Sequence, residues 1–282
     1  MKKNCIIAII LCSIVLSAAC QSGHRGNSGS IQTLSARISA EEARRIGQMI
    51  WYNESRRDIR GLTGWNAREE FASLGIAHFI WYPAGVPRRF KETFPSFVSY
   101  AVREGAHVPA WLRQATVNPW SDRMHFYQDF EGAQMQELRH FLSQTMDLQT
   151  RFILRRLDEA LPLMLGSASA PESSHIERQF ARLVSSPGGI YALADYVNFK
   201  GEGIYHGEAY RGYGWGLKQV LLEMRGEGTA EALRDFVFSA RKVLHRRVEH
   251  SPPERQEDRY LAGWSNRLET YLQYQYTSYL QN

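Results

Sequence analysis

All three cysteines of this 282-residue chain lie within its first twenty residues, at positions 5, 12 and 20. From residue 21 onward the chain therefore folds without a disulfide, a thiolate metal site or a cysteine nucleophile, and an apolar core has to stabilise it. With 44% apolar and 22% charged residues, the composition is that of a globular protein. The length suffices for one large domain or two small lobes.

The net charge of the chain is mildly positive. It is +5 overall. Without Lys2 and Lys3 it is +3, because the chain then has 32 basic and 29 acidic residues. This excess suits an anionic surface, but it is far below the dense basic stripe of a nucleic-acid binder. We therefore expect no nucleic-acid partner.

Residues 1–19 have the order of a secretory signal peptide: two lysines, an apolar run from Cys5 to Leu16, and the small residues Ser17-Ala18-Ala19. The apolar run is shorter than the roughly 20 residues that span a bilayer. The segment's end, Leu16-Ser17-Ala18-Ala19-Cys20, resembles a bacterial lipobox, although leucine stands four residues before the cysteine rather than three. We expect lipidation of Cys20, with plain cleavage after Ala19 as the alternative.

The residue after Cys20 bears on where the protein resides. Because Gln21 rather than Asp follows the cysteine, the expected location is the periplasm, with the lipoprotein anchored to the outer membrane. The alternative is a secreted soluble protein. Residues 20–38, rich in Gly, Ser and Asn, are predicted to be a flexible tether to the folded body.

Helical patterns dominate the remaining sequence, so the expected fold class is α+β, mostly α. Ser39 and Glu42 form a capping box before apolar residues at helical spacing, which predicts a helix from Ser39 to Glu54. Residues 71–82 have a β-like composition that contains Gly75 and ends at Pro83, which predicts a hairpin or a small sheet. Residues 166–174 read as a linker, and Gly201 to Gly214 as a Gly-rich loop. Further helices are predicted at 95–104, 109–114, within 124–165, and at 175–185, 189–199, 214–225, 229–247 and 256–279.

Glu54 ends the first predicted helix on the face that carries Ile50 and Ile46. Such a carboxylate is either solvated at the helix end or half-buried, in which case burial raises its pKa. A raised pKa is what a general acid needs near neutral pH. Residue type alone favours the solvated carboxylate.

Several well-known site motifs are missing from the sequence. It contains no His-Glu-x-x-His, Gly-x-Ser-x-Gly, P-loop or dinucleotide-binding motif. We therefore expect neither a cofactor nor a bound metal.

Four segments, taken in order, carry a resemblance to a known family. Ser73-Leu74-Gly75-Ile76-Ala77-His78 is similar to the Thr-Ile-Gly-Ile-Gly-His hairpin of phage-type lysozymes, in which a helix ending in the catalytic Glu precedes the hairpin. Residues 192–201 resemble the core helix of that family, and residues 217–232 its next helix and turn. Gly263-Trp264-Ser265-Asn266-Arg267 with Glu269 resemble its C-terminal Gly-Leu-x-Asn-Arg-Arg-x-x-Glu helix.

This resemblance covers about residues 39–80 and 188–275 and places the chain as a distant member of the lysozyme-like superfamily. It implies a two-lobed fold for residues 39–282, with a small β-hairpin element, an enlarged helical lobe, a cleft between the lobes, and a helical insert at about 83–187. It also implies that Glu54 protonates the leaving glycosidic oxygen of a peptidoglycan strand.

The sequence departs from the family around the second acid. The spacing from Glu54 to Ser73 is nineteen residues, longer than in the phage enzymes, and Ala77 replaces a glycine. The family's Asp before the hairpin has no clean match, and Glu69 or Glu70 is the available substitute. Glu69 is either a base, nucleophile or charge stabiliser, or a loop carboxylate. If Glu54 is the only acid, a lytic transglycosylase mechanism is the consistent one.

The other candidate site residues each have two interpretations. Ser73 either positions water or makes a structural hydrogen bond, and His78 either contacts the substrate or packs behind the sheet. Asn198 either ties the lobes together beside the substrate or is a satisfied buried amide. Tyr213 and Trp215 either stack on sugar rings or are ordinary core aromatics.

Two function classes follow. The first is a lipid-anchored peptidoglycan glycosidase, either a lysozyme or a lytic transglycosylase. The second is a non-catalytic lysozyme-like lipoprotein that binds peptidoglycan or an envelope protein partner.

Overall fold

The computed structural model of the chain describes residues 33–88, 90–205, 207 and 209–277. The predicted signal peptide, Cys20 and the tether up to residue 32 lie outside these residues. The described end of the predicted tether, residues 33–38, is packed rather than free. Its short helix α1 (Leu34–Arg37) contacts α7, and Leu34 and Ile38 are buried. In the described ranges we find no helix that is both long and apolar enough to cross a membrane.

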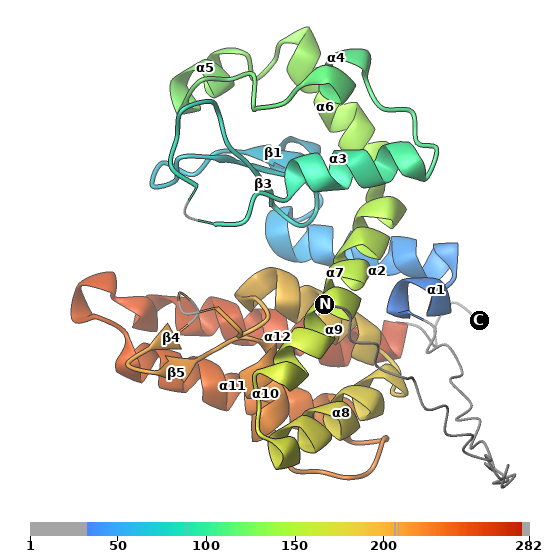
Figure 1. The fold of residues 1–282 in the computed structure, drawn as a ribbon, viewed down its shortest axis with the longest axis vertical. Helices are drawn as coiled ribbons and strands as arrows, with labels where there is room; N and C mark the ends of the chain where they lie inside the picture. The colour runs from blue at the N-terminus through green and yellow to red at the C-terminus, as the bar shows by residue number, and fades with distance from the viewer. Residues whose placement is uncertain (1–32, 89, 206, 208, 278–282) are drawn as a thin grey trace, which may run out of the picture. The chain divides into compact units, whose positions relative to one another are not determined.

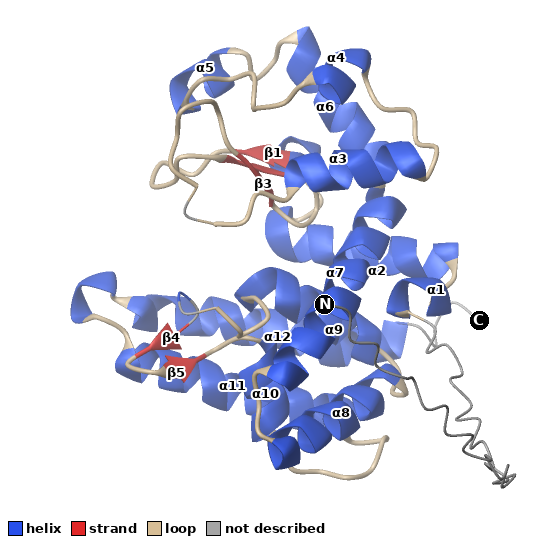
Figure 2. Cartoon of the chain, viewed as in Figure 1, coloured by secondary structure: helices blue, strands red, loops and turns tan. Residues whose placement is uncertain are grey.

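The fold is a mostly helical α+β structure, as the sequence predicted (Figures 1 and 2). Short 3-10 turns η1 (Ile59–Leu62), η3 (Pro253–Arg255) and η4 (Glu257–Tyr260) connect some of its elements. After α1, the α-helices are α2 (Ala40–Ser55), α3 (Phe94–Arg103), α4 (Ala110–Gln114), α5 (Arg123–Gln128), α6 (Ala133–Gln144), α7 (Met146–Gly166), α8 (Ala170–Val184), α9 (Gly189–Lys200), α10 (Leu217–Glu223), α11 (Ala232–His250) and α12 (Leu261–Thr277).

The predicted hairpin is confirmed and belongs to a three-stranded antiparallel sheet. Strands β2 (Ala72–Leu74) and β3 (Phe79–Trp81) form the hairpin, and β1 (Thr63–Gly64) pairs with the other edge of β2. The sequence pattern does not indicate β1, because a two-residue strand has too little pattern to detect. A second, unpredicted hairpin joins β4 (Ala209–Tyr210) to β5 (Tyr213–Gly214) inside the Gly-rich loop.

Helix α2 forms where the capping signal predicted it. The hydroxyl of Ser39 accepts a hydrogen bond from the backbone N–H of Glu42 at 3.0 Å, which satisfies a free donor of the first turn. Ala43, Ile46 and Ile50 are buried along one face. The helix ends where Arg56 adopts a left-handed conformation, with φ of 55°.

The range 83–187 contains the helices α3 to α8, the first of which begins at Phe94. The predicted linker at 166–174 is shorter than expected, because α8 already begins at Ala170. A capping box explains this early start: Glu172 accepts hydrogen bonds from both the backbone N–H and the hydroxyl of Ser169. The apparent linker residues Ala170 and Pro171 thus form the first turn of a helix, where proline is well tolerated.

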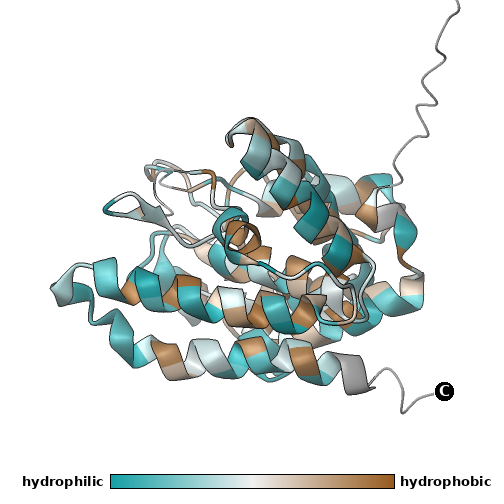
Figure 3. Ribbon diagram, turned by 90° about the horizontal axis from the view of Figure 1, so that it is seen from below, coloured by the Kyte–Doolittle hydropathy of each residue, from teal (hydrophilic) through white to brown (hydrophobic). Residues whose placement is uncertain are grey.

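Helix α7 connects the elements around the sheet with the C-terminal helices. It packs against α1, α2 and α3, and also against α8 and α9 (Figure 1). Hydrophobic and hydrophilic residues alternate along the helix that leads to the C-terminus, as expected for a helix with one buried face (Figure 3). Among the core aromatic rings, Phe79 stacks on Phe97 at 5.1 Å between ring centroids, and Phe152 packs edge-on to both.

Candidate active site

Glu54 lies in the last turn of α2, one turn after the buried Ile50. Its side chain is only 14% exposed, so the half-buried interpretation holds and the solvated one does not. Three residues from three other elements contact its carboxylate. They are Arg267 of α12, Asn198 of α9 and His78 of the β2–β3 turn.

Arg267 makes the closest contact with Glu54. Its Nη2 donates to Oε1 of Glu54 at 2.6 Å. The same guanidinium donates from Nε and Nη2 to the two carboxylate oxygens of Asp195 at 2.8 and 2.9 Å. Its charge also lies 4.3 Å from the ring centroid of Phe199. One arginine thus holds two carboxylates, and it is bidentate to Asp195.

Asp195 is fully buried in α9 and fixes the position of Arg267. Its Oδ2 accepts a hydrogen bond from the hydroxyl of Tyr271 at 2.7 Å, and its Oδ1 lies 3.3 Å from the amide nitrogen of Asn53, which donates to it. Buried charges persist only when paired and hydrogen-bonded. This network therefore ties together α2, α9 and α12 directly beneath Glu54.

The charges around Glu54 decide its ionisation. Burial by itself raises the pKa of this carboxyl, but Arg267 and His78, with hydrogen bonds from Arg267 and Asn198, lower it below its ordinary value of 4.5. For a half-buried Glu54, the sequence predicts a raised pKa. The burial is present, but the raised pKa is not, because the sequence pattern does not reveal Arg267 as a partner of Glu54.

His78 occupies the turn between β2 and β3, and its Nδ1 lies 3.4 Å from Oε2 of Glu54. Its backbone is in the left-handed region, with φ of 50°, which is uncommon for a residue other than glycine. Such conformations are enriched at functional sites, where the surrounding structure holds them in place. The side chain is 42% exposed and faces Glu54 rather than packing behind the sheet.

Glu69 is the second carboxyl in this region. Its loop is held by a hydrogen bond from Nε1 of Trp65 to the carbonyl oxygen of Glu69 at 2.9 Å. Burial raises the pKa of this half-buried group, and the nearby charge of His78 offsets part of that rise. His78 therefore interacts with both carboxyls, whose pKa values are displaced in opposite directions. Of the two, Glu69 and not Glu54 has the raised pKa that a general acid needs in the free protein.

Ser73 lies on the strand that leads to the His78 turn, and Asn198 lies in α9. Ser73 lies in β2 opposite Gly64 and Ile80, and it faces away from the buried Ala72 and Leu74 because strand residues alternate between faces. The amide nitrogen of Asn198 donates to Oε1 of Glu54 at 3.2 Å. Asn198 thus links α9 to α2.

The two predicted aromatic contacts differ in accessibility. Trp215 is buried, and the Arg247 guanidinium lies 4.1 Å from its ring centroid. This places Trp215 in the packing beneath the β4–β5 hairpin rather than on an open surface. Tyr213 is 49% exposed and lies 4.1 Å from the His250 ring. Only Tyr213 of the pair offers an accessible ring face for a sugar.

Arg267 and Asp195 lie in the segments that resemble the lysozyme family, but the sequence pattern indicates no role for either residue. A signal for Asp195 was present, because it is an acid inside the otherwise apolar run from Ala192 to Val197. A buried acid requires a cationic partner. Nothing in the local pattern identifies that partner, which lies 72 positions further along the chain.

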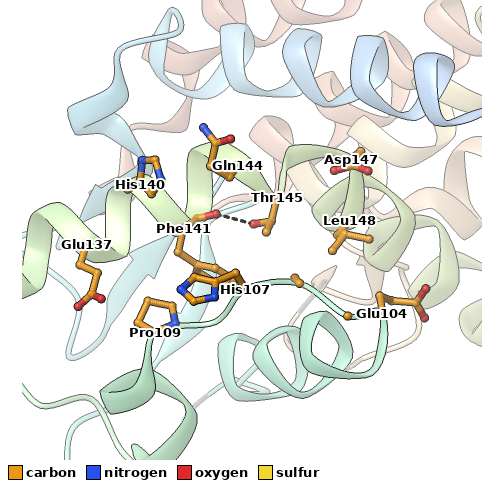
Figure 4. Close-up of a pocket in the computed structure, with 12 residues that line it drawn as sticks. Glu104, His107, Pro109, Glu137, His140, Phe141, Gln144, Thr145, Asp147 and Leu148 are labelled. Atoms are coloured by element: carbon orange, nitrogen blue, oxygen red, sulfur yellow. Dashed lines mark hydrogen bonds between the residues drawn. The ribbon is translucent and has the colours of Figure 1, made fainter.

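A separate pocket lies between the α3–α4 connection and helices α6 and α7 (Figure 4). His107, Glu137 and His140 are among the residues that line it, and it includes none of the residues around Glu54. Within the described ranges, no group of three or more His, Cys, Asp or Glu side chains is arranged to hold a metal ion.

Comparisons of the chain with protein-family models, with curated proteins and with solved structures gave no match. The interpretation of this site therefore rests on its own geometry and on the short sequence segments that resemble phage-type lysozymes.

Proposed function

We propose that this chain is a lipid-anchored cell-envelope enzyme that cleaves the glycan strands of peptidoglycan, with Glu54 as general acid on a two-lobed, lysozyme-like fold. One observation carries the proposal: the Glu54 carboxylate contacts His78, Asn198 and Arg267. Each of these belongs to a different segment with family resemblance, namely the hairpin, the core helix and the C-terminal helix. Unrelated segments with chance resemblances would have no reason to converge on one carboxylate.

Glu54 has to carry a proton to act as a general acid, although in the free protein its pKa is lowered. A glycan strand laid over the carboxylate excludes water, and burial is the influence that raises this pKa. Bound glycan therefore moves Glu54 toward the protonated form. The proton then passes to the glycosidic oxygen as the bond to the anomeric carbon breaks.

The fate of the sugar cation decides between two reactions. In a hydrolase, water adds to the anomeric carbon, and Glu69 is the available second carboxyl to take its proton. In a lytic transglycosylase, the hydroxyl of the same sugar attacks the anomeric carbon and closes an anhydro ring, and Glu54 takes back the hydroxyl proton. The second reaction consumes no water and needs no second carboxyl.

Digestion of purified peptidoglycan, followed by mass spectrometry of the soluble fragments, tests the proposal. Wild-type protein is compared with Glu54→Gln and Glu69→Gln, with the exposed loop variant Glu227→Gln as control. We expect cleavage by wild type and Glu227→Gln and a loss of at least 100-fold in Glu54→Gln, as for removal of a general acid. If the fragments carry anhydro ends and Glu69→Gln keeps full activity, the protein is a transglycosylase. If the fragments carry reducing ends and Glu69→Gln no longer releases them, it is a hydrolase. Cleavage that survives Glu54→Gln contradicts the assignment.

A specific observation favours the second function class, a non-catalytic lipoprotein that binds glycan. The Arg267 ion pair favours the ionised form of Glu54. An ionised Glu54 can accept hydrogen bonds from a bound glycan without catalysing its cleavage. In this case neither wild type nor Glu54→Gln releases fragments, and both sediment with insoluble peptidoglycan.

Lipidation of Cys20 and the outer-membrane location belong to the same proposal. A Cys20→Ala variant of the full chain, expressed in a Gram-negative host and followed by membrane fractionation, tests them. We expect the wild type in the outer-membrane fraction and the variant released from it. Equal partitioning of both proteins contradicts lipid anchoring.

A further inference from the structure

The separate pocket shown in Figure 4 is large enough to hold a small organic ligand. Its volume is about 520 Å³, within the range of about 300–1,000 Å³ that is usual for ligand sites. It lies between the α3–α4 connection and the consecutive helices α6 and α7, and none of the residues around Glu54 lines it. The proposed glycan cleavage therefore gives this pocket no role.

The lining of the pocket is acidic, although the chain as a whole carries a net positive charge. Of the described residues that line the pocket, three are acids and none is a lysine or an arginine. Glu104 caps the end of α3, Glu137 lies in α6, and Asp147 lies in the first turn of α7. A hollow lined by one sign of charge attracts ligands of the opposite sign, so this pocket favours a cation.

The surface between these carboxylates is apolar. The buried residues Pro109 and Phe141 and the half-buried Leu148 line the pocket. In the view of Figure 4, Phe141 lies between Glu137 on one side and Glu104 on the other. An aliphatic chain can therefore bury its methylene groups here while both of its ends reach a carboxylate.

The carboxylates are spread along the pocket. Asp147 follows Glu137 by ten residues on consecutive helices, which corresponds to about 15 Å of helical rise. In the described ranges, no three His, Cys, Asp or Glu side chains are gathered as the ligands of a metal ion would be. The lining thus matches charges that are spaced along an apolar chain better than it matches one compact ion.

Other groups of the pocket are placed to hold an amine. Nε1 of Trp111 donates a hydrogen bond to Oε2 of Glu137 at 2.9 Å, which orients this carboxylate while its Oε1 can still accept from a ligand. His107 lines the pocket as well, and Figure 4 shows it beside Phe141. A neutral imidazole has one accepting nitrogen, which suits an N–H group within the ligand chain.

We propose that this pocket binds a linear aliphatic polyamine, a chain of methylene groups with an ammonium group at each end. One terminal ammonium pairs with Glu137, and the other pairs with Glu104 and Asp147. The methylene groups lie over Phe141 between them. The proposal goes beyond glycan cleavage and does not depend on it.

Isothermal titration calorimetry of the intact chain with spermidine, a linear triamine, tests the proposal. The comparison ligand is spermidine acetylated at one terminal nitrogen, which keeps the chain but loses one terminal charge. We expect wild type to bind spermidine about tenfold more tightly than the acetylated form, as for the loss of one hydrogen bond to a charged group.

Three variants assign the contacts to the two ends of the pocket. Glu137→Gln removes the charge at one end, and the double variant Glu104→Gln with Asp147→Asn removes the charges at the other. The control is Glu177→Gln, at an exposed position of α8 outside the pocket. We expect the first two to bind spermidine at least tenfold more weakly than wild type and to bind both ligands equally, because only one charged end remains. The control should behave as wild type.

Several results would overturn the polyamine site. They are no measurable binding of spermidine by wild type, equal binding of spermidine and its acetylated form by wild type, and a loss of affinity in Glu177→Gln as large as that in Glu137→Gln. Displacement of spermidine by an equal concentration of Mg²⁺ would show an unselective acidic surface and would also overturn it. Digestion of peptidoglycan by the same variants keeps the two proposals apart, since neither result depends on the other.

Discussion

The network around Arg267 makes a quantitative prediction about stability. The substitution Arg267→Gln removes two hydrogen bonds, of 2.8 and 2.9 Å, from the fully buried Asp195 and one of 2.6 Å from Glu54. Asp195 then keeps only the Tyr271 hydroxyl and the Asn53 amide. Removing one partner of a buried ion pair costs about 3–5 kcal/mol, because the other charge stays buried and unpaired. We expect the free energy of unfolding to fall by that amount at pH 7.

Urea unfolding followed by tryptophan fluorescence measures this loss. A matched control exists on the same helix, α12: its Glu269 pairs with Arg241 of α11, but these side chains are 44% and 37% exposed. Exposed pairs contribute little, so Arg241→Gln is expected to cost less than about 1 kcal/mol. The contrast between the two variants isolates burial as the cause.

The same variant tests the pKa of Glu54. In the wild type this pKa lies below 4.5, so ionisation of Glu54 stabilises the fold above pH 4.5, and that stabilisation is lost as the pH falls through the folded-state pKa. Without Arg267, burial is the largest remaining influence, so the pKa of Glu54 rises. The cost of Arg267→Gln should therefore be smaller at pH 4 than at pH 7. The reasoning is refuted by an equal cost at both pH values, or by a cost at pH 7 no larger than that of Arg241→Gln.

Three further predictions concern the loop and turn beside Glu54. Because burial raises the pKa of Glu69, its ionised form opposes folding once the pH has risen through that pKa. Glu69→Gln should therefore unfold at a higher urea concentration than wild type at pH 7, but not below pH 4.5. The control Glu70→Gln should unfold at the same urea concentration as wild type at both pH values. His78→Gly relieves about 1–2 kcal/mol of strain in the left-handed backbone, against about 0.5–1 kcal/mol for the greater chain entropy that glycine loses on folding. The variant should unfold at equal or higher urea concentration, while its peptidoglycan cleavage falls. A decrease of more than about 1 kcal/mol in the free energy of unfolding would contradict the strain. Gly75 and Gly85 both have positive φ, but a Cβ at Gly75 would clash with the Gln149 side chain, whereas one at Gly85 would meet no atom. In thermal unfolding, Gly75→Ala should therefore lower the free energy of unfolding by about 1–3 kcal/mol more than Gly85→Ala. Equal decreases would rule out the clash.

The parts of the fold that the sequence predicted are those with strong local signals. Helix α2 follows from the Ser39 cap and the apolar face through Ile50, and the hairpin follows from strand-like residues around Gly75. Both depend on residues within a few positions of one another, where hydrogen bonds and side-chain spacing act directly. The start of α8 was missed because a capping box at Ser169 was read as linker composition.

The candidate site was predictable only in part, because its electrostatics are non-local. Glu54 was identified from its helix position and from the hairpin that follows it. Burial raises its pKa, but Arg267, 213 positions away, and Asn198, 144 positions away, help to lower it below the ordinary value. A helical pattern predicts which face of the helix a carboxylate occupies. It does not predict which charged residue of another helix contacts that face. Tertiary packing decides the latter.

The ion pair and the acid role of Glu54 are compatible because Arg267 is unequally shared. Asp195 engages both Nε and Nη2 of the guanidinium, whereas Glu54 receives a single hydrogen bond from Nη2. Protonation of Glu54 therefore leaves Arg267 neutralised by Asp195 and costs the network one contact. A glycan that buries Glu54 further opposes its charged form, while Asp195 keeps the arginine in position. Asp195 thus lets Glu54 change its charge during a reaction without releasing α12 from α2 and α9.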